Sequence, residues 1–212
     1  QEKDPNNLWF ARGPRLRMTA EMIRDNALRI SGLLSEEMGG SPIYPPQPAG
    51  LWRQTGRNEP KYVAATNHDR FRRGIYVIWR RAAPYPSFVN FDGPDRSACH
   101  PKRSRTNTPL QALTLLNDAM FVELAQHLAL EAEKLVVDKR IEFLFRKFLT
   151  RPPTSNEAAL MKQYLETQRQ RLGKGALKAP QIMGQKNATA EQAALALLAR
   201  SIMNLDETVT KQ

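Results

Sequence analysis

Prolines place the strongest constraint on the fold of this chain. Nine of them fall in two segments, SPIYPPQPAGLW at residues 41–52 and APYPSFVNFDGPDRSACHPKRSRTNTP at residues 83–109. Because proline fixes φ and has no backbone N–H, a long helix or a central strand cannot run through either segment. We therefore expect irregular chain over residues 41–69 and a series of turns over residues 83–109.

Before the first proline segment, apolar residues recur with the spacing of an α-helix. The stripe consists of Ile23, Ala27, Ile30 and Leu34. Thr19 is the type of residue that caps a helix N-terminus, and Gly39-Gly40 is typical of a helix end. The pattern predicts a core helix that runs from Ala20 to these glycines.

The second proline segment ends in a helix start, the motif TPLQ at residues 108–111. Thr is a preferred N-cap, Pro suits the first helical position, and Gln three residues after the cap completes a capping box. We expect the helix to present its free N–H groups to an anion. Asn117-Asp118 then interrupts it and caps the next helix. The side chains expected in the core are Leu110, Leu113 and Leu116.

The remaining chain has the pattern of helices separated by short breaks. Asp138 is expected to cap the segment IEFLFRKFL. Two further capping boxes are predicted, one from Thr154 and Glu157 and one from Thr189 and Gln192, which starts a final buried helix.

The sequence predicts a mainly α fold: a helical domain with a long, proline-rich irregular strap over residues 70–118 and at most a short β element. Within residues 70–81 the apolar run IYVIW fits a strand or a short buried segment, with a helix as the alternative. We expect a main domain over residues 1–172, an exposed linker over 173–188 and a C-terminal helix over 189–212 that packs back on the main domain.

Positive charge is concentrated in the strap. The chain has a formal net charge of +11, and residues 70–105 hold nine Lys or Arg and two Asp, a net of +7. An earlier basic cluster consists of Arg12, Arg15 and Arg17. Such charge favours an anionic partner: an acidic protein, an anionic glycan, anionic lipid or nucleic acid. Nucleic acid is disfavoured, because the aromatic residues are not interleaved as stacking platforms.

The single cysteine limits the chemistry that this chain can carry. One Cys excludes an internal disulfide, a multi-cysteine zinc site and a Cys-x-x-Cys-His haem attachment. No apolar run approaches the roughly 18 to 20 residues that span a bilayer. We therefore expect no transmembrane segment, and no cofactor or metal bound by this chain.

Candidate binding residues gather in the strap, where the arginines and aspartates have two interpretations. The arginines either pair with Asp92, Asp95 and nearby carboxylates, which is the preferred interpretation, or bind a partner. Two aspartates alone are a weak metal signal. Cys99 is expected as a buried, inert thiol rather than a nucleophile activated by His100 or Arg96. The candidates for ligand or partner binding are Arg72, Arg73, Trp79, Arg80, Arg81, Asp92, Asp95, Arg96, Cys99, Arg105, Asn107, Gln111 and Asn117.

Several segments resemble a known family. They are ARGPRLRMTAEMIRDNALRISGLL, GGSPIYPPQPAGLW, RRGIYVIWRRAAPYPSFVNFDGPDRSACHPKRSRTNTPLQALTLLND, LTRPPTSNE and ARSIMNLDETVTK. They are similar, in the same order, to the planctomycete-type C-terminal domain of unknown function that accompanies planctomycete cytochrome c-type domains in large secreted proteins. The resemblance implies a helical module in the periplasm or cell envelope. It supplies no catalytic residues, and it places any haem on an associated cytochrome domain.

The leading functional hypothesis is a structural or interaction module in an extracytoplasmic, cytochrome-linked protein or complex. Its partner would be another protein, or N-terminal domains of the same protein that are missing from this chain, with an anionic glycan as a further candidate. The first alternative is a part of an enzyme that acts on polysaccharide or in redox chemistry. The second is a binder of anionic polymer through the basic strap.

Overall fold

The structure, a computed structural model, describes residues 4–11, 13, 15–52, 61–99 and 101–211. Over these residues the fold is mainly α, as predicted. The helices are α1 Ala20–Ile30, α2 Pro86–Asn90, α3 Pro109–Asn117, α4 Ala119–Glu133, α5 Val137–Leu149, α6 Ser155–Gly173, α7 Ala179–Met183, α8 Ala190–Met203 and α9 Asp206–Val209. Shorter elements are the 3-10 helices η2 His68–Phe71 and η3 Gly74–Tyr76, and the strands β1 Leu16–Arg17 and β2 Thr210–Lys211.

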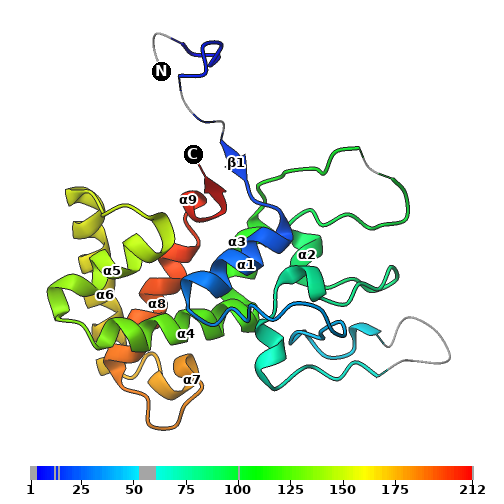
Figure 1. Cartoon of the computed structure of the whole chain (residues 1–212). Coiled ribbons are helices and arrows are strands. Elements are labelled where there is room, and N and C mark those ends of the chain that lie inside the picture. The colour runs from blue at the N-terminus through cyan, green and yellow to red at the C-terminus, as the bar shows by residue number, and fades with distance from the viewer. Residues whose placement is uncertain (1–3, 12, 14, 53–60, 100, 212) are drawn as a thin grey trace.

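The core lies along α4 and α8, which pack against each other within the group of helices on the left of Figure 1. Both helices bury alanines with no exposed surface, among them Ala125 and Ala129 on α4 and Ala193 and Ala199 on α8. Such small side chains let two helices approach closely. Helices α5, α6 and α7 pack around this pair on one side, while α1 and α3 pack on α4.

The predicted helix starts are confirmed at five positions. The side chains of Thr19, Thr108, Asp118, Thr154 and Thr189 each accept a hydrogen bond from a backbone N–H in the first turn of the helix that follows. Both α6 and α8 have the full reciprocal capping box. The capping box predicted for α3 is wrong in its second half, because the Gln111 side chain bonds to Thr106 and Arg17 instead of the Thr108 backbone. These ends were predictable because a cap depends on a few neighbouring residues and not on tertiary packing.

Helix α1 ends earlier than predicted. Its last residue is Ile30, Ser31 is the C-cap, and Gly32 then adopts a φ of 74°. Glycine takes this left-handed conformation without strain, which lets the N–H of Leu34 donate to the carbonyl oxygen of Leu28 at 3.1 Å. The prediction that the helix continues to Gly39 is therefore wrong.

The apolar run between the arginine pairs forms neither a strand nor an α-helix. The 3-10 helices η2 and η3 turn the chain there, so Val77 is buried whereas Ile75 is 74% exposed. The buried Arg24 of α1 holds these turns, because its Nη2 donates to the carbonyl oxygens of Arg70 at 2.5 Å and Arg72 at 3.3 Å. The prediction of a short buried segment is confirmed in part, because Val77 is buried and forms an isolated parallel bridge with Ile43. The run forms no sheet strand, and the helical alternative is wrong.

Two segments expected as loops contain short helices. Pro86 occupies the start of α2, inside the segment predicted as turns, and proline at a first helical position favours this. Helix α7 lies within residues 173–188, where Met183 is 2% exposed and α7 packs on α8. The expectation of a wholly exposed linker is wrong there. The prediction that Asp138 caps α5 is wrong, because Asp138 lies inside the first turn and the N-cap residue is Val136, which has no side-chain acceptor. The division into three parts stays a prediction.

Helix α3 turns the opposite face to the core from the one predicted. Leu110 and Leu113 are 61% and 53% exposed, whereas Gln111 and Thr114 are 2% and 9% exposed. Leu115 is the apolar residue that α3 buries. The prediction followed the spacing of leucines, which cannot show which polar side chains will find hydrogen-bond partners inside the protein.

The two strands join the beginning and the end of the described chain. Strand β1 pairs antiparallel with β2, with Leu16 opposite Lys211 and Arg17 opposite Thr210. Figure 1 shows β1 beside the C-terminal strand, next to the start of α1. This pairing fixes the position of Arg17, which is the first residue of the candidate site.

Candidate functional site

A cavity of about 260 Å³ opens where β1 leads into α1, near the end of α2 and the start of α3. We call it the basic pocket. Four of its lining side chains are cationic and one is anionic, and the buried Met18 and Phe91 add apolar surface. The pocket can therefore receive an anionic group that also carries some apolar surface. Its lining residues are Arg17, Met18, Thr19, Phe91, Asp92, Lys102, Arg103, Ser104, Arg105 and Gln111.

The end of α2 aims Asp92 at the loop that precedes α3. Asp92 has a φ of 58°, and the N–H of Gly93 donates to the carbonyl oxygen of Phe88 at 2.7 Å. A Cβ on Gly93 would lie 2.7 Å from that same oxygen, so only glycine fits. The backbone N–H and the hydroxyl of Thr106 then donate to the two carboxylate oxygens of Asp92 at 2.7 and 2.8 Å.

A second group of hydrogen bonds joins this loop to α3 and β1. The amide Nε2 of Gln111 donates to the Thr106 hydroxyl at 3.1 Å. The Gln111 carbonyl oxygen accepts a hydrogen bond from Arg17, which also donates to Asp206 at 3.2 Å. Because Gln111 is 2% exposed and its amide is hydrogen-bonded at both ends, this wall of the pocket is fixed before any ligand arrives.

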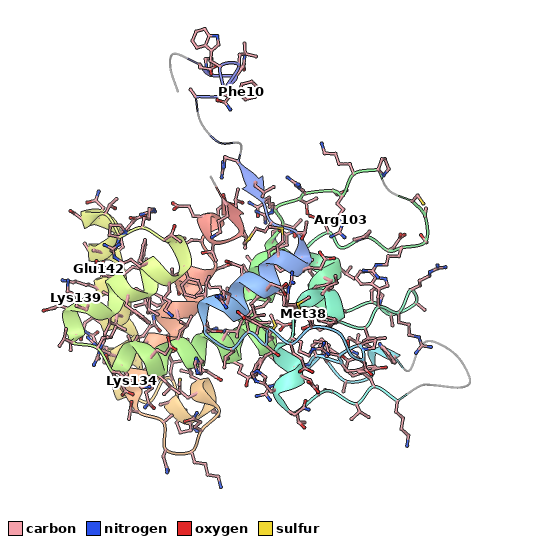
Figure 2. The ribbon with its side chains drawn as sticks, viewed as in Figure 1. Phe10, Met38, Arg103, Lys134, Lys139 and Glu142 are labelled. Carbon is pink, nitrogen blue, oxygen red and sulfur yellow. The ribbon has the colours of Figure 1, made fainter. Side chains whose placement is uncertain are left out.

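The cations of the loop differ in their ion pairs. Arg103 donates to Glu21 at 2.7 Å and lies beside the start of α1 (Figure 2). Burial raises the pKa of Glu21, but the hydrogen bond from Arg103 and the other hydrogen bonds outweigh it, so the pKa is lowered. Lys102 and Arg105 are exposed, and neither forms an ion pair with a described residue. These two cations are therefore available to a partner.

The basic pocket brings together three of the residues selected from the sequence, Asp92, Arg105 and Gln111. Asn107 is exposed in the same loop. Asp95 lines an open depression of about 290 Å³ that shares Asp92 and Lys102 with the basic pocket. The carboxylate of Asp95 accepts hydrogen bonds from the N–H and hydroxyl of Ser97, at 3.0 and 2.7 Å.

The arginine pairs that flank the apolar run lie outside the pocket and have internal contacts. Arg72 is 4% exposed, donates to two backbone carbonyl oxygens and lies over the Tyr76 ring at 4.1 Å. Arg73 pairs with Asp25 at 3.3 Å, and Arg80 lies over the Trp52 ring at 4.8 Å. Arg81 is exposed. The described contacts of Arg72 and Arg73 are thus made with carbonyls, a ring and Asp25, and not with Asp92.

The other candidates are also spread outside the pocket. The Arg96 guanidinium lies over the Trp79 ring at 4.5 Å, and Asn117 donates to the carbonyl oxygen of Leu113 at 2.9 Å. Cys99 is exposed, so the expectation of a buried thiol is wrong. The long loop that carries Cys99 extends away from the helices (Figure 1), so the core does not surround its thiol. His100 and Arg12 lie outside the described residues.

Several pocket residues were absent from the sequence-based candidates: Arg17, Met18, Thr19, Phe91, Lys102, Arg103 and Ser104. The net charge of residues 70–105 already included Lys102 and Arg103, so charge was a usable signal for these two. Arg17 was visible as part of an earlier basic cluster. Nothing local showed that pairing of β1 with β2 would carry it to the strap.

The described residues contain neither a cluster suited to a metal ion nor a helix suited to span a membrane. Among them, no group of three or more His, Cys, Asp or Glu side chains is arranged to hold a metal ion. No helix in this part of the chain combines the length and apolar character needed to cross a membrane.

Comparison with known proteins gives one result. The model of the PSD1 family, described as a protein of unknown function (DUF1553), matches residues 1–165. No curated protein and no solved structure matches the chain.

Proposed function

This chain belongs to the PSD1 family of proteins of unknown function, and we propose that it is a non-catalytic interaction module that docks an acidic protein partner. The observation that carries the proposal is the basic pocket, whose exposed Lys102 and Arg105 have no ion pair among the described contacts. A carboxylate of the partner enters this pocket and contacts the side chains of Lys102 and Arg105.

The hydrogen bonds in the wall of the pocket favour ligand binding over catalysis. The carboxylate of Asp92, the one anionic group among the described residues that line the pocket, accepts hydrogen bonds from Thr106 at both oxygens. Arg17 is held by Gln111 and Asp206 and keeps its place when a ligand arrives. Fixed donors around an exposed cationic rim favour charge-assisted hydrogen bonds to a carboxylate.

A binding experiment with three polyanions tests the proposal. Polyglutamate represents an acidic protein, polygalacturonate an anionic glycan and a DNA duplex nucleic acid. We expect polyglutamate to bind most tightly, and its affinity to fall steeply as salt concentration rises, because the exposed charges are screened. Isothermal calorimetry at low and high salt measures both effects.

Charge-reversal variants locate the binding site. Lys102→Glu with Arg105→Glu should abolish polyglutamate binding at low salt. The control, Lys162→Glu with Lys186→Glu, makes the same change in net charge at exposed positions of the helical part, residues 119–209. It should bind polyglutamate with nearly the affinity of the parent. Equal losses in both double variants would show that only the overall charge matters. An affinity unaffected by salt would contradict electrostatic docking.

We also propose, on the resemblance of the sequence segments, that the chain works outside the cytoplasm and is linked to a cytochrome c-type domain. Any haem then belongs to that associated domain. Cell fractionation with an antibody against this chain, followed by haem staining of the co-purified material, tests both statements. Recovery in the cytoplasm, or a full-length protein and complex without haem, would contradict them.

A further inference from the structure

Helix α3 buries polar side chains and exposes apolar ones, which is the reverse of an ordinary core helix. It buries Gln111 and Thr114, at 2% and 9% exposure, and leaves Leu110 and Leu113 at 61% and 53%. Residues three apart on a helix lie on the same face, so the two leucines form one exposed stripe. We call Leu110 and Leu113 the leucine face.

Hydrogen bonds to the buried polar side chains stabilise this orientation of α3. Burial of a polar side chain is unfavourable unless it is hydrogen-bonded. Gln111 meets this requirement through Arg17 and Thr106, and Thr114 through the carbonyl oxygen of Leu110 at 2.8 Å and the Nδ2 of Asn90 at 2.8 Å. These hydrogen bonds fix the rotation of α3 and hold the leucine face outward.

The leucine face follows the basic loop directly. The exposed Lys102 and Arg105 precede α3 by a few residues, and Leu110 lies in the first turn of the helix that follows this loop. Gln111, on the buried side of α3, is the helix residue that lines the pocket. A protein interface commonly has an apolar centre inside a polar, charged rim. Two leucines alone are too small for a stable interface, which buries about 800 Å² on each partner, so the basic loop has to contribute to it.

We propose that the leucine face is the apolar centre of a docking surface for an acidic amphipathic helix of another protein. The proposal rests on the proposed function for the acidic character of the partner and adds its apolar side chains and their place of contact. Charge complementarity selects this occupant: the rim formed by the loop is cationic, so the partner carries leucine-type side chains flanked by carboxylates. A second copy of this chain, with its net charge of +11, would bring cations against cations.

Synthetic peptides provide the probe. The test peptide is an amphipathic helix with leucines on one face and glutamates on the other, and two comparison peptides have the same composition in scrambled order or lysines in place of the glutamates. Titration of the 15N-labelled chain, followed by NMR, should show the test peptide perturbing amide signals of α3 and of the loop before it. The two comparison peptides should leave the signals of α3 unchanged.

Serine variants measure the contribution of the leucines. Leu110→Ser with Leu113→Ser should weaken binding of the test peptide by about tenfold, which corresponds to about 1.4 kcal/mol, because the two side chains no longer remove apolar surface from water when the peptide binds. Both positions are exposed, so the fold should survive, and thermal unfolding checks this. Leu160→Ser is the matched control, because Leu160 is 60% exposed on α6, and it should bind as the parent does.

The possible outcomes separate this inference from the proposed function. If the double serine variant binds the test peptide as tightly as the parent while polyglutamate still binds in a salt-dependent way, the leucine face is overturned and electrostatic docking stands. If both probes fail to bind, both are overturned. Binding to vesicles of anionic phospholipid, or self-association, that depends on Leu110 and Leu113 in the absence of peptide binding would also overturn the proposed occupant.

Discussion

The arginines of the helical part and those of the strap are held in different ways. In the helical part, Arg140 and Arg169 both bind Glu191, at 2.6 and 2.7 Å, and Arg151 binds Glu157 and Glu207. In the strap part, the buried Arg72 donates to backbone carbonyl oxygens, as does Arg24, which reaches the strap from α1. A carbonyl satisfies a guanidinium N–H but does not cancel its charge.

This difference decides where charge remains for binding. Residues 1–110 carry a net charge of +8 and residues 111–212 a net of +3. Among the described residues, the helical part uses its glutamates to link one helix to another, so its cations contribute mainly to stability. The strap has few carboxylates of its own. Some of its arginines therefore pair with carboxylates of other elements, as Arg70 does with Glu123 and Arg103 with Glu21. Others lie against carbonyls and rings, or remain at the surface around the basic pocket.

The largest expected effect on stability comes from substitution of Arg24, the α1 residue that hydrogen-bonds to the strap. Arg24→Ala removes the donor to the carbonyl oxygens of Arg70 and Arg72 and leaves a cavity, since Arg24 is 1% exposed. We expect a loss of about 3–5 kcal/mol in the free energy of unfolding, because buried polar groups lose their partner. Chemical denaturation followed by circular dichroism measures it.

The control for Arg24 lies on the same helix. Arg29→Ala removes an exposed arginine that pairs with Glu36, and exposed pairs contribute about 1 kcal/mol or less. A loss at Arg24 no larger than the loss at Arg29 would show that the carbonyl contacts do not hold the strap.

A smaller effect is expected in the helical part, where it depends on pH. Hydrogen bonds, the largest from Arg151, lower the pKa of Glu157 to about 2. A carboxyl group with a lowered pKa in the folded state stabilises the protein above its ordinary pKa, and this contribution disappears as pH falls from about 4.5 toward 2. Glu157→Gln should therefore lower the free energy of unfolding by about 1 kcal/mol at pH 7, since the pair is partly exposed.

The same variant should be as stable as the parent near pH 2. Gln keeps the capping box geometry of α6, so the difference reports the charge rather than the cap. Unfolding by urea over a series of pH values follows the change. A difference between the two proteins that stays constant from pH 7 to pH 2 would mean that the Arg151 contact contributes no charge-dependent stability.

Local sequence signals predicted the helix starts and the fold class, and tertiary contacts explain the errors. Thr108 and Thr154 act through residues one turn away, so their caps were visible in the sequence. The rotation of α3 was not predictable, because it depends on Gln111 meeting Arg17, a residue 94 positions earlier. Of the site, Asp92, Arg105 and Gln111 were predicted as candidates, but no local signal indicated that they share one cavity.

The smallest expected effect concerns Arg96, an exposed arginine of the strap. Its guanidinium lies over the Trp79 ring at 4.5 Å, and an exposed cation–π contact contributes about 0.5–1 kcal/mol. Arg96→Ala should therefore change the free energy of unfolding by no more than this, because Trp79 still stacks on Phe88. Acrylamide should quench indole fluorescence more strongly in the variant, since Trp79 loses its cover. A loss as large as that of Arg24→Ala would show that exposed arginines also hold the strap, and that its surface charge is not free for a partner.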